Sequence, residues 1–273
     1  MPLELPTSLS PSKVSAFKDC ALAFRFSAID GLPEPPSVPA TRGTLVHAAL
    51  ERLFCLPAPD RTPEAGQACL AEATAAIRTH PDFVDLGLDA DAEAAFLGEA
   101  ATLVERYFAL EDPRTIHPIG IELRLAVEVG GVTLRGIIDR LELDDDGELV
   151  VTDYKTGRAP AERYEQTRLG GVHFYAFLCE RLFGKRPARV QLLHLHEPVA
   201  IVTVPTAQST RGLENRVTAI WAAVERACAH DDFRPKPGPL CAWCAFQAHC
   251  PAFGGDPAAA RQAVATPVAA PVA

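Results

Sequence analysis

Apolar and polar side chains alternate along residues 119–154, with a period of two that is typical of β-strands. Two turn motifs interrupt the alternation, a Gly-Gly pair that begins at Gly130 and an aspartate-rich turn that ends at Gly147. Both compositions favour tight hairpin turns between neighbouring strands. The pattern therefore predicts a three-stranded meander, with strands over 119–129, 132–143 and 148–154.

The remaining apolar positions mostly follow helical spacing. A serine cap and a proline, Ser10 and Pro11, predict the start of a first helix whose apolar positions reach Phe26. The prolines of residues 31–40 predict a connector, and the Ala/Pro/Val-rich residues 254–273 predict a disordered tail. Further elements are expected as a helix from residue 41, two or three helices within 60–112, helices over 169–183 and 213–230, and strands over 190–196 and 199–204.

The helix over 169–183 lies between the meander and the strand over 190–196. A strand that returns to the sheet after a helix makes that sheet mixed rather than purely antiparallel. The predicted fold class is therefore α/β, with a mixed β-sheet core flanked by helices.

Polar side chains with metal-binding chemistry occur within the predicted hairpin. Asp139 lies inside the second strand, and Asp153 and Lys155 close the third. A buried strand tolerates an unpaired carboxylate poorly, so both aspartates need a cation, a hydrogen-bond network or a cleft. Because Asp153 and Lys155 are two residues apart, they point to the same face of the strand. Two carboxylates there could bind Mg²⁺ or Mn²⁺ beside a lysine that holds a phosphate or activates a water, and a simple salt bridge is the alternative.

Two further side chains could reach the same cleft. His47 lies in the helix from residue 41, on one helical face with Glu51. A lone helix histidine is more often a surface or core residue than a ligand, but imidazole can join carboxylates around Mn²⁺ or Mg²⁺. Glu122 lies on the polar face of the first strand, where a solvent-facing carboxylate is the more common alternative.

Length and composition are those of an ordinary soluble globular protein. The chain has 273 residues, enough to bury one good core, and its hydrophobic fraction of 48% and charged fraction of 22% are unexceptional. No apolar run is long enough to span a bilayer, and the N-terminus lacks a basic region followed by an apolar one. We therefore expect a cytoplasmic protein without a membrane partner.

The net charge of −9 looks wrong for a nucleic-acid-binding protein until it is divided along the chain. Residues 60–112 contain twelve acids and three arginines, which accounts for the whole imbalance, whereas residues 154–191 contain eight bases and three acids. A polyanion could contact the second surface without meeting the first. Charge therefore permits DNA as a partner without arguing for it.

Eight cysteines in a cytosolic chain point toward metal or redox chemistry more than toward disulfides. Cys241, Cys244 and Cys250 are spaced C-x2-C-x5-C in a loop with Pro and Gly, which lets several sulfurs converge on one centre. A fourth ligand is normally needed, and the candidates are Cys20, Cys55, Cys69, Cys179, Cys228 and His249. Cys69, Cys179 and Cys228 fall in predicted helices, whereas Cys20 would staple the two ends of the chain together. Zinc and an iron–sulfur cluster fit this spacing almost equally, although a zinc ribbon more usually shows a second C-x2-C motif.

Taken together, motifs spread over residues 9–255 resemble those of the RecB-type exonuclease branch of the PD-(D/E)XK nuclease superfamily. In particular, they resemble the members with an iron–sulfur staple, such as the AddB nuclease domain and the CRISPR-associated iron–sulfur exonucleases. The resemblance implies a restriction-endonuclease-like core in a single domain over 1–253, an acidic helical insertion over 60–112 and a cysteine region over 233–253. The motifs are LSPSKVSAFKDC, RGTLVHAALE, GIIDRLE, VVTDYKTG and CAWCAFQAHCPAFGG.

Carried over by position, the resemblance implies roles for individual residues. His47, Asp139, Asp153 and the backbone carbonyl of Tyr154 would bind Mg²⁺ or Mn²⁺. Lys155 would be the catalytic lysine, alongside the catalytic carboxylates Asp139 and Asp153. The ligands of a structural [4Fe–4S] cluster would be Cys20, Cys241, Cys244 and Cys250.

Contacts with DNA are expected from Arg140, Arg158 and Arg168, which could bind the phosphate backbone, and from Tyr175, which could stack on bases. Solvated charge and core packing are the more common roles of such residues. The family has a glutamine four residues before the helix tyrosine, whereas this chain has Gly171. This departure puts the DNA-positioning role of that helix in question.

The function predicted from these features is metal-dependent hydrolysis of DNA by an exonuclease acting on single strands or ends, in DNA repair or recombination. A helicase or another repair protein is the expected partner besides DNA. One alternative is a DNA-binding subunit of a repair complex whose nuclease site is vestigial. Another is a zinc-stapled α/β protein with an unrelated metal-dependent hydrolase activity.

Overall fold

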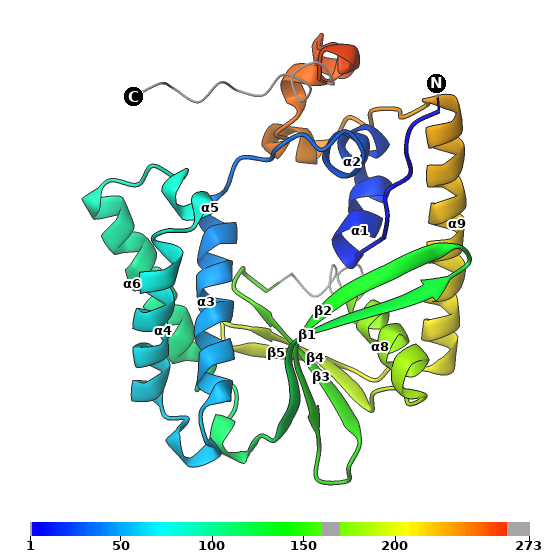
Figure 1. The fold of residues 1–273 in the computed structure, drawn as a ribbon. Helices are drawn as coiled ribbons and strands as arrows, with labels where there is room; N and C mark the ends of the chain where they lie inside the picture. Colours follow the sequence, from blue (N-terminus) through cyan, green and yellow to red (C-terminus); the bar gives the residue numbers. More distant parts are fainter. Residues whose placement is uncertain (1, 160–169, 261–273) are drawn as a thin grey trace. The chain divides into compact units, whose positions relative to one another are not determined.

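The fold is seen in a computed structural model that describes residues 2–159 and 170–260 (Figure 1). Arg168 and residues 261–273 of the predicted tail lie outside the described residues. Within the described part of the chain, no helix is both long and apolar enough to cross a membrane.

A five-stranded mixed sheet with the order β1-β2-β3-β4-β5 forms the centre of the fold, as predicted. Strand β2 pairs antiparallel with β3, with Arg140 opposite Thr152. Strand β3 pairs parallel with β4, with Asp153 opposite Leu192, and β4 pairs antiparallel with β5. The strands are β1 (Pro118–Val129), β2 (Val132–Leu143), β3 (Leu149–Lys155), β4 (Arg189–His194) and β5 (Val199–Thr203).

The helices agree in number and place with most of the sequence pattern. Three of them fall within the acidic segment 60–112. The helices are α1 (Pro11–Asp19), α2 (Ala21–Ala28), α3 (Val38–Cys55), α4 (Pro63–Ile77), α5 (Pro81–Val84), α6 (Ala90–Tyr107), α8 (Gly170–Phe183) and α9 (Ala207–His230). Short 3₁₀ turns are η1 (Ala58–Asp60), η2 (Pro113–Thr115), η3 (Pro239–Trp243), η4 (Gln247–His249) and η5 (Pro251–Phe253).

Three helix boundaries differ from the predicted ones. The first predicted helix is two helices, because Cys20 adopts an extended conformation with φ −158° and ψ 111°. Helix α3 starts inside the predicted connector, where Ser37 accepts a hydrogen bond from the Ala40 amide and Pro39 occupies the first turn. Helix α9 begins at Ala207, before its first buried apolar residue, Leu213.

The chain divides into two compact units, and the site described below lies within the second. Unit 1 comprises residues 1–35, 128–135 and 214–273, and unit 2 comprises residues 36–127 and 136–213. One folding domain over residues 1–253 stays a prediction.

The core of unit 2 joins the helical segment to the sheet. Apolar faces of α3, α4 and α6 pack together, with Leu50, Leu70 and Leu103 all nearly fully buried. Tyr154 of β3 and Leu193 of β4 belong to the same cluster. The helical segment is therefore packed into the core that holds the site strand, with most of its acids on the solvent side and Glu111 turned inward to Arg140.

Candidate functional site

The main chain of Tyr154 is the centre of the site. Its N–H donates to Asp139 Oδ2 at 2.6 Å, across the β2–β3 pair. Its carbonyl oxygen lies 3.1 Å from His47 Nε2. One buried residue of β3 thus links the aspartate of β2 to the histidine of α3.

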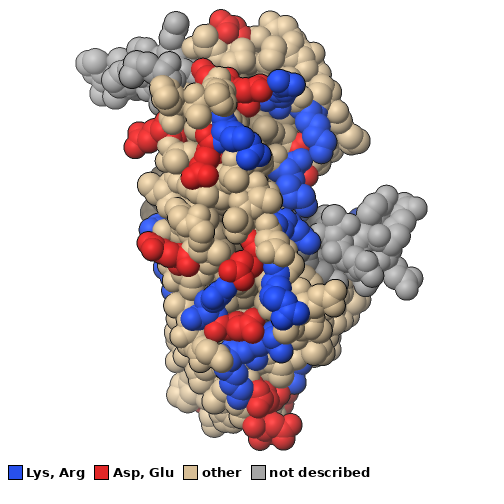
Figure 2. All heavy atoms as spheres, turned by 90° about the vertical axis from the view of Figure 1, so that its right-hand side faces the viewer, with Lys and Arg blue, Asp and Glu red and all other residues tan. Residues whose placement is uncertain are grey.

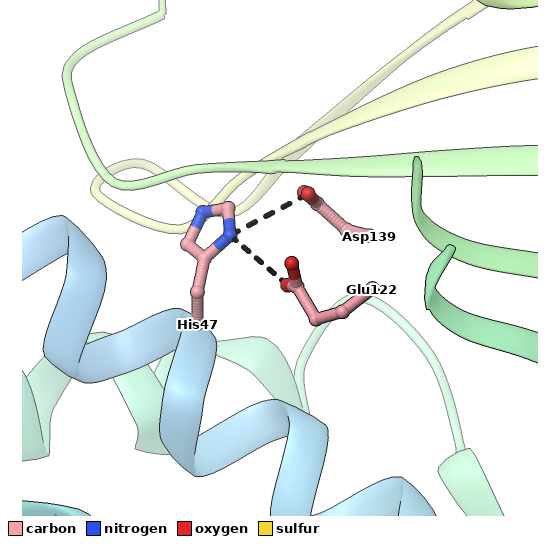
Figure 3. A group of neighbouring side chains, drawn as sticks. All are labelled: His47, Glu122 and Asp139. Carbon is pink, nitrogen blue, oxygen red and sulfur yellow. Dashed lines mark ion pairs between the residues drawn. The ribbon is translucent and has the colours of Figure 1, made fainter. Parts of the chain in front are cut away.

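The second imidazole nitrogen of His47 faces two carboxylates (Figure 3). Nδ1 lies 3.5 Å from Asp139 Oδ1 and 3.9 Å from Glu122 Oε1. One ligand atom from each of these three residues lies within 4.8 Å of the other two. One imidazole and two carboxylates at this spacing form a donor set suited to Mg²⁺ or Mn²⁺.

A close helix-to-loop approach positions His47. A Cβ added at Gly43, one turn earlier in α3, would lie 3.1 Å from Thr156 Oγ1. The absence of a side chain at Gly43 lets α3 lie against the residues that follow β3. The motif that contains Gly43 and His47 thus brings the imidazole to the end of the site strand.

Glu122 reaches the site through an unusual backbone conformation. Its φ is +46°, the left-handed region, in the middle of β1. A residue other than glycine adopts this conformation at a cost, on the order of 1–3 kcal/mol. The sequence pattern placed Glu122 on the polar face of the strand but did not predict this turn of the backbone toward His47.

Asp153 and Lys155 form a second, adjacent pair. Their carboxylate and ammonium groups are ion-paired, and the Asp153 side chain is only 4% exposed whereas that of Lys155 is 43% exposed. Burial raises the pKa of Asp153, the Lys155 ammonium acts in the opposite direction, and the nearby Asp139 raises it further. Burial, together with the Asp153 and Asp139 carboxylates, raises the pKa of the Tyr175 hydroxyl of α8.

The site opens on a cleft of about 560 Å³. Residues of α3 form one side, and Tyr154 to Gly157 lie on another. His47, Glu122 and Lys155 all line it, so the histidine, a carboxylate and the ammonium group meet in one solvent-accessible space. This is the arrangement that a hydrolytic metal site requires.

The protonation of His47 reflects this acidic surrounding. Burial alone would lower its pKa, but the contacts with the Asp139 and Glu122 carboxylates and the charges of Asp139 and Asp153 outweigh burial and raise the pKa to about 10. Without a metal the site therefore holds a proton on this imidazole. A divalent cation would replace that positive charge.

The expected DNA contacts are placed very differently. Arg140 is fully buried and bound to protein acceptors, so its prediction as a backbone contact is wrong. A charged residue in a strand does not always face solvent, because a carboxylate can pair with it in the core. Arg158 is exposed, Tyr175 is half-buried, and Arg168 lies outside the described residues.

Exposed charge is mixed on the face that carries α9. Figure 2, which views the structure from the right-hand side of Figure 1, shows Lys and Arg side chains interspersed with Asp and Glu. Arg216, Glu225 and Arg226 of α9 are all exposed. Both signs of charge are therefore exposed along α9 itself.

The four predicted cluster cysteines all lie in unit 1 as free, partly exposed thiols. Two contacts join the N- and C-terminal segments near these cysteines: Lys236 Nζ donates to the Lys18 carbonyl at 3.1 Å, and the rings of Phe26 and Phe246 lie 5.6 Å apart. The Gly238 N–H also donates to Cys241 Sγ at 3.3 Å, a contact typical of sulfurs that serve as ligands. Among the described residues, His47, Glu122 and Asp139 form the group whose ligand atoms lie within 4.8 Å of one another, and the four sulfurs do not reach that spacing. Cys20, Cys241, Cys244 and Cys250 therefore stay a predicted ligand set.

The chain is similar to known proteins in family, sequence and fold. A family model described as the PD-(D/E)XK nuclease superfamily matches residues 8–251. The Gene 69 protein of Mycobacterium phage L5 is 31% identical over 136 residues, which cover 49% of this chain and 44% of the phage protein. This match therefore spans less than half of the phage L5 protein.

Two further matches span most of both chains. The Gene 69 protein of Mycobacterium phage D29 is 25% identical over 267 residues, which cover 89% of this chain and 96% of that protein. The crystal structure of an exonuclease candidate from Eubacterium rectale has a TM-score of 0.57 at 13% identity, over 88% of this chain and 87% of the other. At this identity the structural likeness concerns the fold.

Proposed function

The chain belongs to the PD-(D/E)XK nuclease superfamily, and from this premise we propose that it is a divalent-metal-dependent deoxyribonuclease. We propose further that it belongs to the RecB-type branch and acts as an exonuclease on single-stranded DNA or DNA ends in repair or recombination. The observation that carries the proposal is the meeting of His47, Asp139 and Lys155 around the main chain of Tyr154.

The proposed metal ligands are His47, Asp139, Asp153 and the Tyr154 carbonyl, with Glu122 as an additional carboxylate. When bound, Mg²⁺ or Mn²⁺ would polarise the phosphodiester and lower the pKa of a water molecule. The carboxylates and imidazole would fix the cation at the end of β3.

Lys155 has the exposure that a catalytic lysine needs. Its ammonium group lines the cleft and is held by the buried Asp153 carboxylate. Hydrolysis forms a bond between a water oxygen and phosphorus and breaks the bond from phosphorus to a deoxyribose oxygen, which leaves with a proton. The Lys155 ammonium would orient the water and stabilise the negative charge that develops on the phosphoryl oxygens.

The cysteines would hold a [4Fe–4S] cluster that joins the N- and C-terminal segments of unit 1 and takes no part in hydrolysis. Free thiols at all four positions and the contacts that bracket them support this assignment. A zinc ion on the same ligands is the competing assignment, and iron content with visible absorbance of anaerobically purified protein distinguishes the two.

The test of the nuclease proposal is digestion of end-labelled single- and double-stranded DNA with Mn²⁺ or Mg²⁺. Metal-dependent loss of label is expected for the parent protein, and none for Asp153→Ala. DNA binding without cleavage would favour the second candidate function, a DNA-binding subunit with a vestigial site.

The second candidate rests on Gly171, which stands where the family has a glutamine. Among the described residues, no heavy atom outside the nearby backbone of α8 lies within 4 Å of a Cβ added at this position, so the described neighbours leave space for a longer side chain. If the missing amide limits DNA positioning, Gly171→Gln should raise cleavage. If the site is vestigial for other reasons, the substitution should leave cleavage absent.

A further inference from the structure

The guanidinium of Arg140 is buried, and each of its N–H groups donates a hydrogen bond to an acceptor. A guanidinium carries five N–H donors in a rigid planar fork. Nε donates to Glu142 at 2.6 Å, Nη1 donates to Glu111 and to the Tyr154 hydroxyl at 2.8 Å, and Nη2 donates to Glu111 at 3.0 Å and to Thr152 at 3.1 Å. The side chain is completely inaccessible to solvent.

These acceptors come from three parts of unit 2. Glu111 follows α6 in the acidic helical segment, Glu142 lies in β2 and Thr152 and Tyr154 lie in β3. The guanidinium also stacks on the Phe54 ring of α3, 4.7 Å from its centroid. A single side chain therefore ties the helical segment and the histidine-bearing helix to the site strand.

Tyr154 connects this network to the candidate metal site. Its hydroxyl accepts from Arg140, while its main chain contacts Asp139 and His47. Because Arg140 restrains the Tyr154 ring, it also restrains the Tyr154 amide and carbonyl, which contact Asp139 and His47. Mutation of a residue that holds a metal ligand in place typically changes metal affinity by about 10- to 100-fold.

We propose that Arg140 is a positioning residue that acts through Tyr154 to hold the metal ligands in place, with Glu111 extending the restraint to the helical segment. The proposal deepens the proposed function, because it names what preorganises the same site. It also assigns the segment 60–112 a part in the site, for which its sequence gave no chemical signal.

Arg61 provides a matched comparison within the same unit. It is also buried, and it donates to the backbone carbonyls of Leu56, Pro113 and Ile116 at 2.8–3.1 Å. Its guanidinium stacks on the same Phe54 ring at 5.1 Å. Within residues 2–159 and 170–260, the hydrogen bonds of Arg61 go to backbone carbonyls and none goes to Tyr154 or to the site ligands. Its loss should therefore affect folding stability alone.

The test compares Arg140→Lys, Tyr154→Phe, their double variant and Arg61→Lys in the full chain. Mn²⁺ affinity is measured by calorimetry, hydrogen exchange is followed at the Tyr154 amide, and kcat and KM are measured on single-stranded DNA. Tyr154→Phe removes one hydroxyl and keeps the main chain, so it remains informative if Arg140→Lys folds poorly.

The proposal predicts that Arg140→Lys and Tyr154→Phe each weaken Mn²⁺ binding by about 10-fold and speed exchange at the Tyr154 amide. Because both act through one contact, the double variant should lose little more than either single variant. Arg61→Lys should lower the melting temperature without changing Mn²⁺ affinity. Loss in kcat with KM nearly unchanged is expected for Arg140→Lys.

Two results would overturn the proposal. One is an Arg140→Lys protein that is destabilised like Arg61→Lys but retains parental Mn²⁺ affinity and amide protection. The other is a double variant whose losses simply add. If the parent cleaves no DNA, the nuclease proposal fails, yet exchange at the Tyr154 amide still decides whether Arg140 positions that residue.

Discussion

The Nε2 atom of His47 lies 3.1 Å from the carbonyl oxygen of Tyr154, although the two residues are 107 positions apart in sequence. The contact joins α3 to β3 at the point where the Asp139 carboxylate accepts the Tyr154 amide. Each of the three residues belongs to a different element of unit 2. The site therefore depends on the folded arrangement of that unit and on no single motif.

Loss of the cleft lysine should remove cleavage without unfolding the protein. Lys155→Ala is expected to lower kcat by at least about 100-fold, because one preorganised charge at the developing oxyanion typically contributes that much. Lys185→Ala is the matched control, since Lys185 has similar exposure, 45% against 43%, and also pairs with a carboxylate. Equal rates for the two variants would remove Lys155 from the mechanism.

Glu122 should contribute to cation binding. Glu122→Gln keeps the shape of the side chain but removes one negative charge from the cluster of His47 and Asp139. We expect Mn²⁺ affinity to fall by about 10-fold, as for loss of a charged neighbour of the ligands. Glu128→Gln, an exposed change in the same strand, should have no effect, and a parental Mn²⁺ affinity in Glu122→Gln would show that this carboxylate faces water only.

The raised pKa of His47 predicts a pH-dependent stability in the metal-free protein. Burial lowers the pKa of His47, but Asp139 and Glu122 outweigh it and raise the pKa from 6.5 to about 10. The folded state therefore holds the proton more tightly than the unfolded chain, so the stabilisation is complete below pH 6.5 and is lost as pH rises toward 10.

Thermal unfolding in EDTA between pH 6.5 and about 10 tests the direction of this pH dependence of stability. The melting-temperature difference between the parent and His47→Gln should shrink as pH rises. Mn²⁺ should also bind more tightly at higher pH, because the imidazole must release its proton to act as a ligand. A pH-independent difference between the two proteins would contradict this electrostatic description of the site.

Removal of a proposed cluster ligand should affect stability and cofactor content together. Cys20→Ala or Cys250→Ala is expected to reduce bound metal and soluble yield, because the staple closes a long loop whose ordering is otherwise unfavourable. Cys55→Ala, at an exposed cysteine in the last turn of α3, is the control. Parental metal content and melting temperature in both ligand variants would exclude this set of cysteines.

The alternation of apolar and polar residues was sufficient to predict the strands, because the meander buries one face and turns at glycines. All five strand ranges agree with the structure within two residues, and the sheet is mixed as the order of elements implied. The break at Cys20 was not predictable in the same way, because the apolar spacing on its two sides suits one continuous helix. Its extended backbone is visible only in the folded chain.

Candidate site residues could be predicted from the sequence where a charged side chain occurs in an otherwise apolar strand. Asp139 and Asp153 are carboxylates in apolar strands, and that conflict identified them. The positions of Glu122 and Arg140 could not be predicted in this way. A charged residue in a strand where apolar and polar residues alternate is normally assigned to the solvent face. A left-handed backbone turns Glu122 toward His47, and the remote Glu111 pairs with Arg140 inside the core. Both depend on partners that sequence spacing does not reveal.

We propose that this chain hydrolyses DNA at the site organised by Tyr154. The most direct measurement is digestion of 5′- and 3′-end-labelled DNA by the anaerobically purified parent protein and by Asp153→Ala, each with Mn²⁺ and with EDTA. Loss of label by the parent with Mn²⁺ alone, and none by Asp153→Ala under either condition, is the predicted result. Cleavage that persists in Asp153→Ala or in EDTA would contradict the account.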